Sequence, residues 1–160
     1  MRQRRNKIVK IDIGIIKQLR EKTKAGVADC RRALEETEGD MRKAVEWLRQ
    51  KGIKSAGKRV DREAKQGIVF AYSHNQGQIL GVVELNCETD FVARTEEFKN
   101  LAKELAMQVA AMSPKDDKEL LSQVWIRDAR KTIEELVKET SGKTGEKVEV
   151  KRVARFVLGE

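Results

Sequence analysis

The sequence has little histidine, cysteine or aromatic character, and it has no long apolar run. The single histidine, His74, excludes a metal cluster built from histidines, and its place in a turn segment favours a solvated residue over a general base. The two cysteines, Cys30 and Cys87, lie far apart, and no hydrophobic signal-peptide segment follows the basic start. We therefore expect reduced thiols in a cytoplasmic protein. No apolar run approaches the roughly 18 residues of a membrane span, so no membrane association is expected.

Charged residues are abundant by contrast: they make up 38% of the chain, and the net charge is +8. Residues 1–10 contain five basic and no acidic residues, and residues 42–65 contain nine basic and three acidic residues. We interpret residues 1–10 as a solvated basic arm, with binding to a phosphate backbone as the alternative. One candidate function is thus an RNA- or ribosome-binding module that acts through the arm and the basic linker. Against it, the core has few aromatic side chains for base stacking.

Residues 11–53 are predicted to form three short helices. Apolar residues recur at helical spacing in each segment, and Gly39 followed by Asp40 is typical of a left-handed helix end and a new N-cap. Gly52 is expected to end the third helix. The positions assigned to the buried faces are Ile15, Ile16, Leu19, Val27, Cys30, Ala33, Leu34, Met41, Ala44, Val45 and Leu48. Residues 54–65 are basic with few large apolar side chains, so we interpret them as a linker, partly helical.

Residues 66–160 are predicted to form an α+β core. Two apolar segments, 67–73 and 78–85, flank a turn and predict an antiparallel hairpin whose second strand is central in the sheet. Apolar side chains at helical spacing over 98–112 predict a long helix that Ser113 and Pro114 end, and a further helix is expected around 129–140. The last segment alternates. It predicts a strand that pairs with the hairpin, with Val148, Val150, Ala154, Phe156 and Leu158 on one face.

Patterns that suggest an enzyme are weak. Residues 141–144 end like a nucleotide-binding phosphate loop, but Val137 stands where that loop needs glycine, and a helix instead of a strand precedes them. Adjacent carboxylates at 35–36, 116–117 and 134–135 fall on solvated faces or helix starts. We therefore expect no catalytic residues, no metal ligands and no cofactor, and the chain is not expected to be an enzyme.

The segment 86–94 joins the apolar strand to the long helix and places Phe91 directly after Asp90, outside either apolar stripe. Two interpretations are open. In one, Phe91 and Val92 cap the core while Thr89 or Asp90 binds loop amides. In the other, the aromatic ring is an exposed probe that inserts into a partner protein.

Residues 85–94, LNCETDFVAR, resemble a signature of the elongation factor Ts family. Residues 16–30, IKQLREKTKAGVADC, resemble the other family signature, which residues 31–34 and 44–49 continue, and residues 145–152 are similar to the closing strand. The resemblance implies an N-terminal three-helix bundle like a ubiquitin-associated domain, a linker, and an α+β core with a small antiparallel sheet packed against helices. It implies a guanine nucleotide exchange factor whose partner is elongation factor Tu, with no direct nucleotide binding by this chain.

The resemblance also assigns partner-binding residues. Thr89, Asp90, Phe91 and Val92 match the segment that enters near the partner's Mg²⁺ site, where Phe91 would wedge between elements that hold the ion. Disturbing that ion weakens the binding of GDP.

Two smaller contacts are implied as well. Val27 and Ala28 match residues that pack on the partner's nucleotide domain, and Thr144 and Gly145 match a turn near its phosphate-binding loop. The chain departs from the family pattern because Val27 and Ala28 are smaller than usual, Thr144 replaces an isoleucine, and residues 114–144 form a shorter stretch than in most members. A homodimer through the C-terminal sheet is a further expectation.

Overall fold

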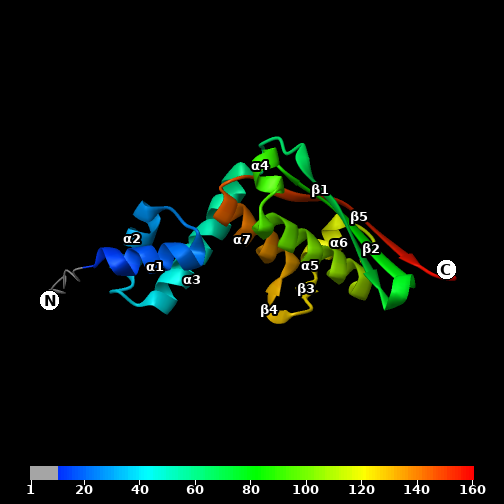
Figure 1. Ribbon diagram of the computed structural model, residues 1–160, viewed down its shortest axis with the longest axis horizontal. Helices are drawn as coiled ribbons and strands as arrows, with labels where there is room; N and C mark the ends of the chain where they lie inside the picture. The colour runs from blue at the N-terminus through cyan, green and yellow to red at the C-terminus, as the bar shows by residue number, and fades with distance from the viewer. Residues whose placement is uncertain (1–10) are drawn as a thin grey trace, which may run out of the picture. The chain divides into compact units, whose positions relative to one another are not determined.

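The computed structural model describes residues 11–160, so the basic arm predicted over residues 1–10 lies outside the described residues. The described chain is a mixed helix-and-strand structure with a small antiparallel sheet packed against helices, as predicted (Figure 1). It divides into two compact units: a first unit that ends at Lys51, and a second unit, Gly52–Glu160.

Three helices build the first unit: α1 (Ile13–Thr23), α2 (Val27–Glu36) and the greater part of α3 (Met41–Ala56). Asp40 caps α3, because its carboxylate accepts hydrogen bonds from the N–H groups of Arg42 and Lys43 at 2.9 and 3.1 Å. The side chains buried between the helices are Leu19, Cys30, Ala33, Leu34, Ala44 and Leu48. The predicted stripes are confirmed at these positions, whereas Val27 and Val45 are exposed.

The prediction that the third helix ends at Gly52 is wrong. Helix α3 continues to Ala56 and is followed by a 3-10 turn, Gly57–Arg59. The first half of the predicted linker is therefore helical. Gly52 within the helix lies against Gly142 of α7. A Cβ atom added to Gly142 would lie only 2.5 Å from the Cα atom of Gly52, so the close approach requires glycine. The glycine thus marks a close helix contact within the second unit and not a helix end.

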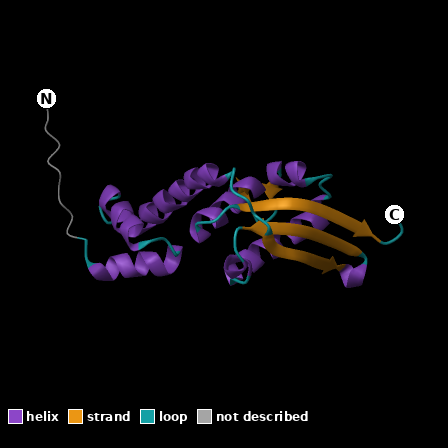
Figure 2. Ribbon diagram, turned by 90° about the horizontal axis from the view of Figure 1, so that it is seen from above, coloured by secondary structure: helices purple, strands orange, loops and turns teal. Residues whose placement is uncertain are grey.

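The sheet of the second unit contains β1 (Gln66–His74), β2 (Ile79–Cys87) and β5 (Val148–Val157) in the order β1-β2-β5. Both pairings are antiparallel, and β2 is central, as its near-continuous apolar sequence predicts. Figure 2 shows the three long strands side by side. The hairpin and the returning C-terminal strand are thus confirmed.

The remaining elements follow β2 along the chain: α4 (Asp90–Ala93), α5 (Glu96–Met112), α6 (Asp117–Ser122), β3 (Val124–Trp125), β4 (Asp128–Thr132) and α7 (Ile133–Thr144). Helix α5 matches its prediction. Helix α7 begins later than expected, because Thr132 and Glu135 form a capping box at its start. The short elements α6, β3 and β4 were not predicted, since none is long enough to show a period.

The alternation in β5 is interrupted by a bulge. The register with β2 shifts between Glu84 and Leu85, which leaves Lys151 as the extra residue on β5. Beyond the bulge Val153 packs against the core, whereas Phe156 is 61% exposed. The predicted inward position of Phe156 is therefore wrong, because one extra residue reverses the faces of the strand.

Candidate functional site

Residues 89–92 form the first part of the candidate site, directly after β2. Thr89 is the N-cap of α4, and its hydroxyl oxygen accepts a hydrogen bond from the N–H of Val92 at 3.4 Å. The segment expected to be a loop is therefore a single helical turn. It ends where Thr95 begins to cap α5 in the same way. Of Thr89 and Asp90, which were the two residues expected to bind amides here, Thr89 does so.

The side chains of this turn point in different directions. Val92 is half-buried and packs against the core of the second unit, so it anchors the turn. Phe91 is 79% exposed, which makes it one of the most exposed large apolar side chains among the described residues. Asp90 forms an exposed ion pair with Arg94 at 2.9 Å. Of the two interpretations left open, core capping fits Val92, and an exposed probe fits Phe91.

The second part of the candidate site is the turn between α7 and β5. Helix α7 ends at Thr144, whose hydroxyl group donates a hydrogen bond to the Thr140 carbonyl at 2.9 Å. Gly145 follows in the left-handed conformation with φ of 75°, and an added Cβ there would meet no atom within 4 Å. The backbone of the turn is thus accessible to a partner, although its conformation favours glycine.

Two carboxylates hold these parts together. The Glu146 carboxylate accepts hydrogen bonds from the N–H groups of Glu88 and Thr89 at 3.1 and 3.0 Å, and from the Thr89 hydroxyl at 2.6 Å. The Glu88 carboxylate in turn accepts a hydrogen bond from the N–H of Lys147 at 2.6 Å. We call this reciprocal arrangement of Glu88 and Glu146 the carboxylate clamp. It brings residues 89–92 next to residues 144–145, which are far apart in the sequence.

The carboxylate of Glu88 is further stabilised by Arg62, which donates a hydrogen bond to it at 3.2 Å. The pKa of Glu88 is lowered, mainly by the backbone hydrogen bond from Lys147 and then by Arg62, while partial burial opposes the shift. Arg62 comes from the basic segment that was predicted to be a linker. One positive charge of this basic segment, that of Arg62, is therefore paired with Glu88 at the candidate site.

Cys87 lies beneath the same turn as a buried free thiol. Its Sγ atom donates a hydrogen bond to the Thr89 carbonyl at 3.1 Å. Burial raises the pKa of Cys87 to about 11, with a further contribution from the negative charge of Glu146. The group is therefore a neutral thiol at physiological pH, and it acts as a small core residue with one hydrogen bond.

Sequence reasoning missed Glu88 and Glu146 as site residues. Each lies within a motif that was singled out, since Glu88 belongs to residues 85–94 and Glu146 to residues 145–152. Nothing in periodicity connects the two, because the hydrogen bonds span 57 to 59 residues of sequence. The signal that could have identified them was a carboxylate beside each turn, because the backbone N–H groups of a turn need acceptors.

The other predicted contact residues lie in the first unit. Val27 and Ala28 occupy the first turn of α2. The N-cap residue is Gly26, which has an extended backbone and no side chain to accept hydrogen bonds from the helix N–H groups. Both side chains are exposed, and Val27 retains 54% of its accessible surface. Val27 was also assigned to the buried stripe of its helix, which is wrong because this first turn extends beyond the packed faces.

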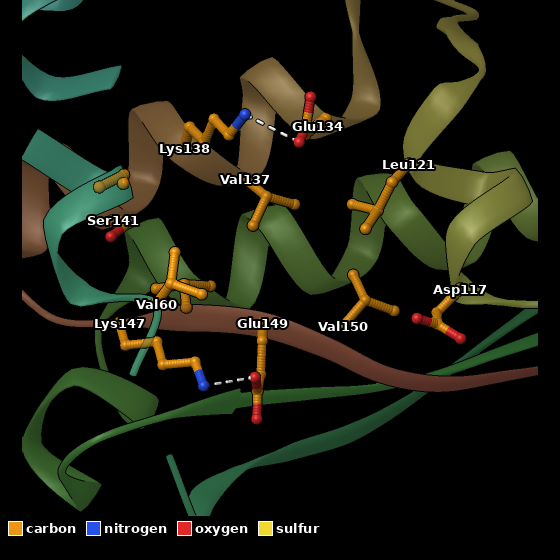
Figure 3. A pocket seen from close by; sticks show the side chains of 13 residues that line it. Val60, Asp117, Leu121, Glu134, Val137, Lys138, Ser141, Lys147, Glu149 and Val150 are labelled. Atoms are coloured by element: carbon orange, nitrogen blue, oxygen red, sulfur yellow. Dashed lines mark ion pairs between the residues drawn. The ribbon is translucent and has the colours of Figure 1, made fainter. Parts of the chain in front are cut away.

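A groove of about 280 Å³ runs between the end of α3, helices α6 and α7, and the first residues of β5 (Figure 3). Val60, Leu121, Val137 and Val150 contribute apolar side chains to its lining. Its rim carries the ion pairs Lys138–Glu134 at 2.8 Å and Lys147–Glu149 at 2.7 Å. The lining hydroxyl of Ser141 already donates a hydrogen bond to the Glu146 carbonyl. The groove is thus an apolar surface with paired charges at its edge.

Residues 141–144 lie in the last turns of α7, so the region that resembles a phosphate loop is helical. Within residues 11–160, no group of three histidine, cysteine, aspartate or glutamate side chains is placed to hold a metal ion. Over the same residues, no helix is both long and apolar enough to cross a membrane. The features that remain distinctive are the two turns joined by the carboxylate clamp.

Comparison with known proteins agrees with the resemblance seen in the motifs. A family model described as Elongation factor TS matches residues 88–160, which begin at Glu88 of the carboxylate clamp. A protein named Elongation factor Ts from Trichodesmium erythraeum is 43% identical, over 96% of this chain and 91% of its own length. Proteins of the same name from Rippkaea orientalis and a Nostoc species are 42% and 44% identical, over 77% and 48% of their own lengths.

The alignment with the Trichodesmium protein extends over 199 positions, whereas this chain has 160 residues. The relative therefore has inserted residues within the matched region. The identity is high and the coverage is nearly complete on both sides. The chain belongs to the elongation factor Ts family of translation elongation factors.

Proposed function

We propose that the chain is a guanine nucleotide exchange factor that binds elongation factor Tu·GDP, disturbs its Mg²⁺ and phosphate site, and promotes GDP release during translation elongation. The observation that carries the proposal is Phe91, an aromatic side chain 79% exposed on a helical turn that is anchored on both sides. Family membership supports the choice of partner. The chain would act by binding, in the cytoplasm, without a cofactor and without catalysing a chemical reaction.

The physical basis of the mechanism is a wedge. Transfer of a phenylalanine side chain from water into an apolar site is favourable by about 1.5–3 kcal/mol. Most of the Phe91 side chain is still exposed to water in the free protein and can be buried in a partner. If Phe91 enters the partner between elements that hold Mg²⁺, part of this free energy moves those elements apart. Asp90 would take part in the rearrangement. Its ion pair with the exposed Arg94 is weak, so Asp90 can leave it and bind a group of the partner instead.

Exchange is then a case of linkage between two ligands of one protein. A factor that binds the nucleotide-free partner more tightly than the GDP-bound partner lowers the affinity for GDP by the same ratio. Val27 and Ala28 would supply binding in the first unit, and Thr144 and Gly145 would supply it next to the phosphate-binding loop. Contacts that do not change between the two states add affinity for the partner, but they do not accelerate release.

We also propose a homodimer through the C-terminal sheet. One face of this sheet packs on the core, whereas the other carries exposed apolar side chains, of which Val69 on β1 and Phe156 on β5 are 65% and 61% exposed. The same face carries Val82 of the central strand, which pairs with Ala71 and Ala154. Sedimentation over a range of concentrations, with Phe156→Asp as the variant, distinguishes a dimer from a monomer.

The exchange proposal is tested by stopped-flow release of fluorescent GDP from elongation factor Tu. Native protein is expected to accelerate release, and Phe91→Ala to lose most of the acceleration. Leu158→Ala is the matched control, because Leu158 is equally exposed at 79% and lies directly after the last residue of β5. A native protein without effect would refute the exchange function. A Phe91→Ala protein as fast as native would refute the wedge alone.

A further inference from the structure

We propose that Glu146 is a positioning residue for the exposed Phe91, a role that rests on the proposed exchange function. Its carboxylate forms no hydrogen bond with Phe91 itself. Instead it accepts three hydrogen bonds from Glu88 and Thr89, the two residues that precede α4. Glu146 therefore acts on the partner through the turn, by holding Phe91 in the orientation that inserts.

Helix α4 needs such support from outside because it is only four residues long. A helix of this length is not stable by itself, since nucleation fixes several residues for very few hydrogen bonds. The Thr89 hydroxyl accepts from the N–H of Val92 and donates to Glu146. The carboxylate thus orients the hydroxyl that caps the helix, and its negative charge lies at the helix N-terminus, where it is favourable.

The reverse half of the carboxylate clamp explains why the two turns behave as one body. Glu88 accepts from the N–H of Lys147, the residue directly after Glu146, and its other contact is with Arg62. Each carboxylate binds backbone next to the other, so neither turn can shift without breaking bonds on both sides. Binding to a partner then does not have to order Phe91 and Gly145 separately, which reduces the entropy lost on association.

The first test is made on the free protein and does not depend on exchange. Amide hydrogen exchange at Glu88 and Thr89 is measured by NMR in native protein and in Glu146→Gln, which keeps the shape but loses the charge. We expect exchange at these amides to rise about tenfold or more, because charge-assisted bonds are replaced by weaker ones. Unchanged protection would overturn the positioning role, whether or not the chain acts on elongation factor Tu.

The matched control is Glu104→Gln. Glu104 is a carboxylate of the same unit that pairs with Arg127 at 2.7 Å, and neither residue contacts the two turns. This variant is expected to leave amide exchange at Glu88 and Thr89 at the native rate. If Glu146→Gln does not fold, Thr89→Val and Thr89→Ser replace it. Valine removes the hydroxyl that bonds Glu146, and serine restores it, so serine is expected to rescue the protection that valine loses.

The second test is a double-mutant cycle on stimulated GDP release. Glu146→Gln is expected to lower the stimulated rate about tenfold in the native background and to have little further effect in Phe91→Ala. A general structural role would lower the rate equally in both backgrounds, and that additive result would overturn the proposal. If native protein does not stimulate release at all, the exchange function fails, and the amide measurement still decides whether Glu146 positions the turn.

Discussion

The two units present their predicted contact residues in different ways. In the second unit, Phe91 stands on a turn fixed by Thr89, by packing of Val92 and by the carboxylate clamp. In the first unit, Val27 stands on the first turn of α2, where Gly26 provides no side-chain cap. Both side chains are exposed, but their turns are held differently. Hydrogen bonds from backbone N–H groups to Glu146 hold the turn of Phe91, whereas a partly exposed ion pair between Asp29 and Lys51 joins the first turn of α2 to α3.

This difference predicts which contact residue can change the conformation of a partner. A side chain that is held in one orientation can displace elements of the protein it enters, whereas one on a helix turn without a side-chain N-cap adjusts more easily to the partner. If the chain acts as the proposed exchange factor, we expect the second unit to promote nucleotide release and the first to add affinity.

Replacing Phe91 by alanine is expected to reduce stimulated GDP release by about 30-fold or more, equivalent to about 2 kcal/mol, because buried aromatic anchors dominate protein interfaces. The free energy of unfolding should change by less than about 0.5 kcal/mol, since the side chain is exposed in the free protein. Stopped-flow release and urea denaturation measure the two quantities. A large loss of stability would mean that Phe91 supports the fold, and the assignment of a partner contact would then be wrong.

Gly145→Ala is expected to destabilise the second unit by about 1–2 kcal/mol, because φ of 75° is unfavourable for a residue with a Cβ atom. Gly26→Ala is the matched change in the first unit. Gly26 has φ of −61° and open space around it, so its replacement should cost less than about 0.5 kcal/mol. Urea denaturation can follow each unit separately, with Trp47 as the reporter in the first and Trp125 in the second. Equal effects at both glycines would contradict this comparison.

Much of the fold could be predicted from the sequence where a period extends over several turns or pairs. Helix α5 shows its apolar stripe from Phe98 to Val109, and the hairpin shows two apolar strands around a turn. Phe156 was misplaced, because one extra residue at Lys151 reverses the faces of the strand. The adjacent polar residues Lys151 and Arg152 break the alternation, but the sequence does not show that a bulge lies there. The continuation of α3 through Gly52 was also hidden, since only a contact with distant Gly142 explains it.

The candidate site was predictable in part for the same reason. Phe91 drew attention because a large apolar side chain stood outside both neighbouring stripes, and its exposure in the structure agrees with that interpretation. The carboxylate clamp was not predictable, because Glu88 and Glu146 meet through backbone N–H groups that no residue pattern identifies. Local sequence shows which side chain is free, whereas the bonds that fix it depend on tertiary structure.

Val27→Ala is expected to weaken binding to elongation factor Tu by about threefold to fivefold, or about 1 kcal/mol, through the loss of two methyl groups. If the first unit contributes only affinity, the maximal rate of GDP release at saturating factor should be unchanged. A titration of stimulated release against the concentration of the variant separates the two effects. A lowered maximal rate at saturation would mean that the first unit also takes part in release, and the division of roles would fail.

Acid titration gives the smallest expected effect and compares one carboxylate from each unit. The pKa of Glu88 is lowered by the N–H of Lys147 and then by Arg62, and the pKa of Asp40 is lowered by the N–H groups of Lys43 and Arg42. A depressed pKa means that the stabilisation is present above the unfolded value of about 4.5 for glutamate and is lost as the pH falls through the folded value. Glu88→Gln should therefore destabilise the second unit more at about pH 6 than at about pH 3, and Asp40→Asn should do the same for the first unit. Carboxyl NMR titration checks the pKa values directly. The N–H of Lys147 donates to Glu88, so amide protection at Lys147 should fall on acidification together with protonation of Glu88. Protonation of Asp40, which only caps α3, should leave Lys147 unaffected.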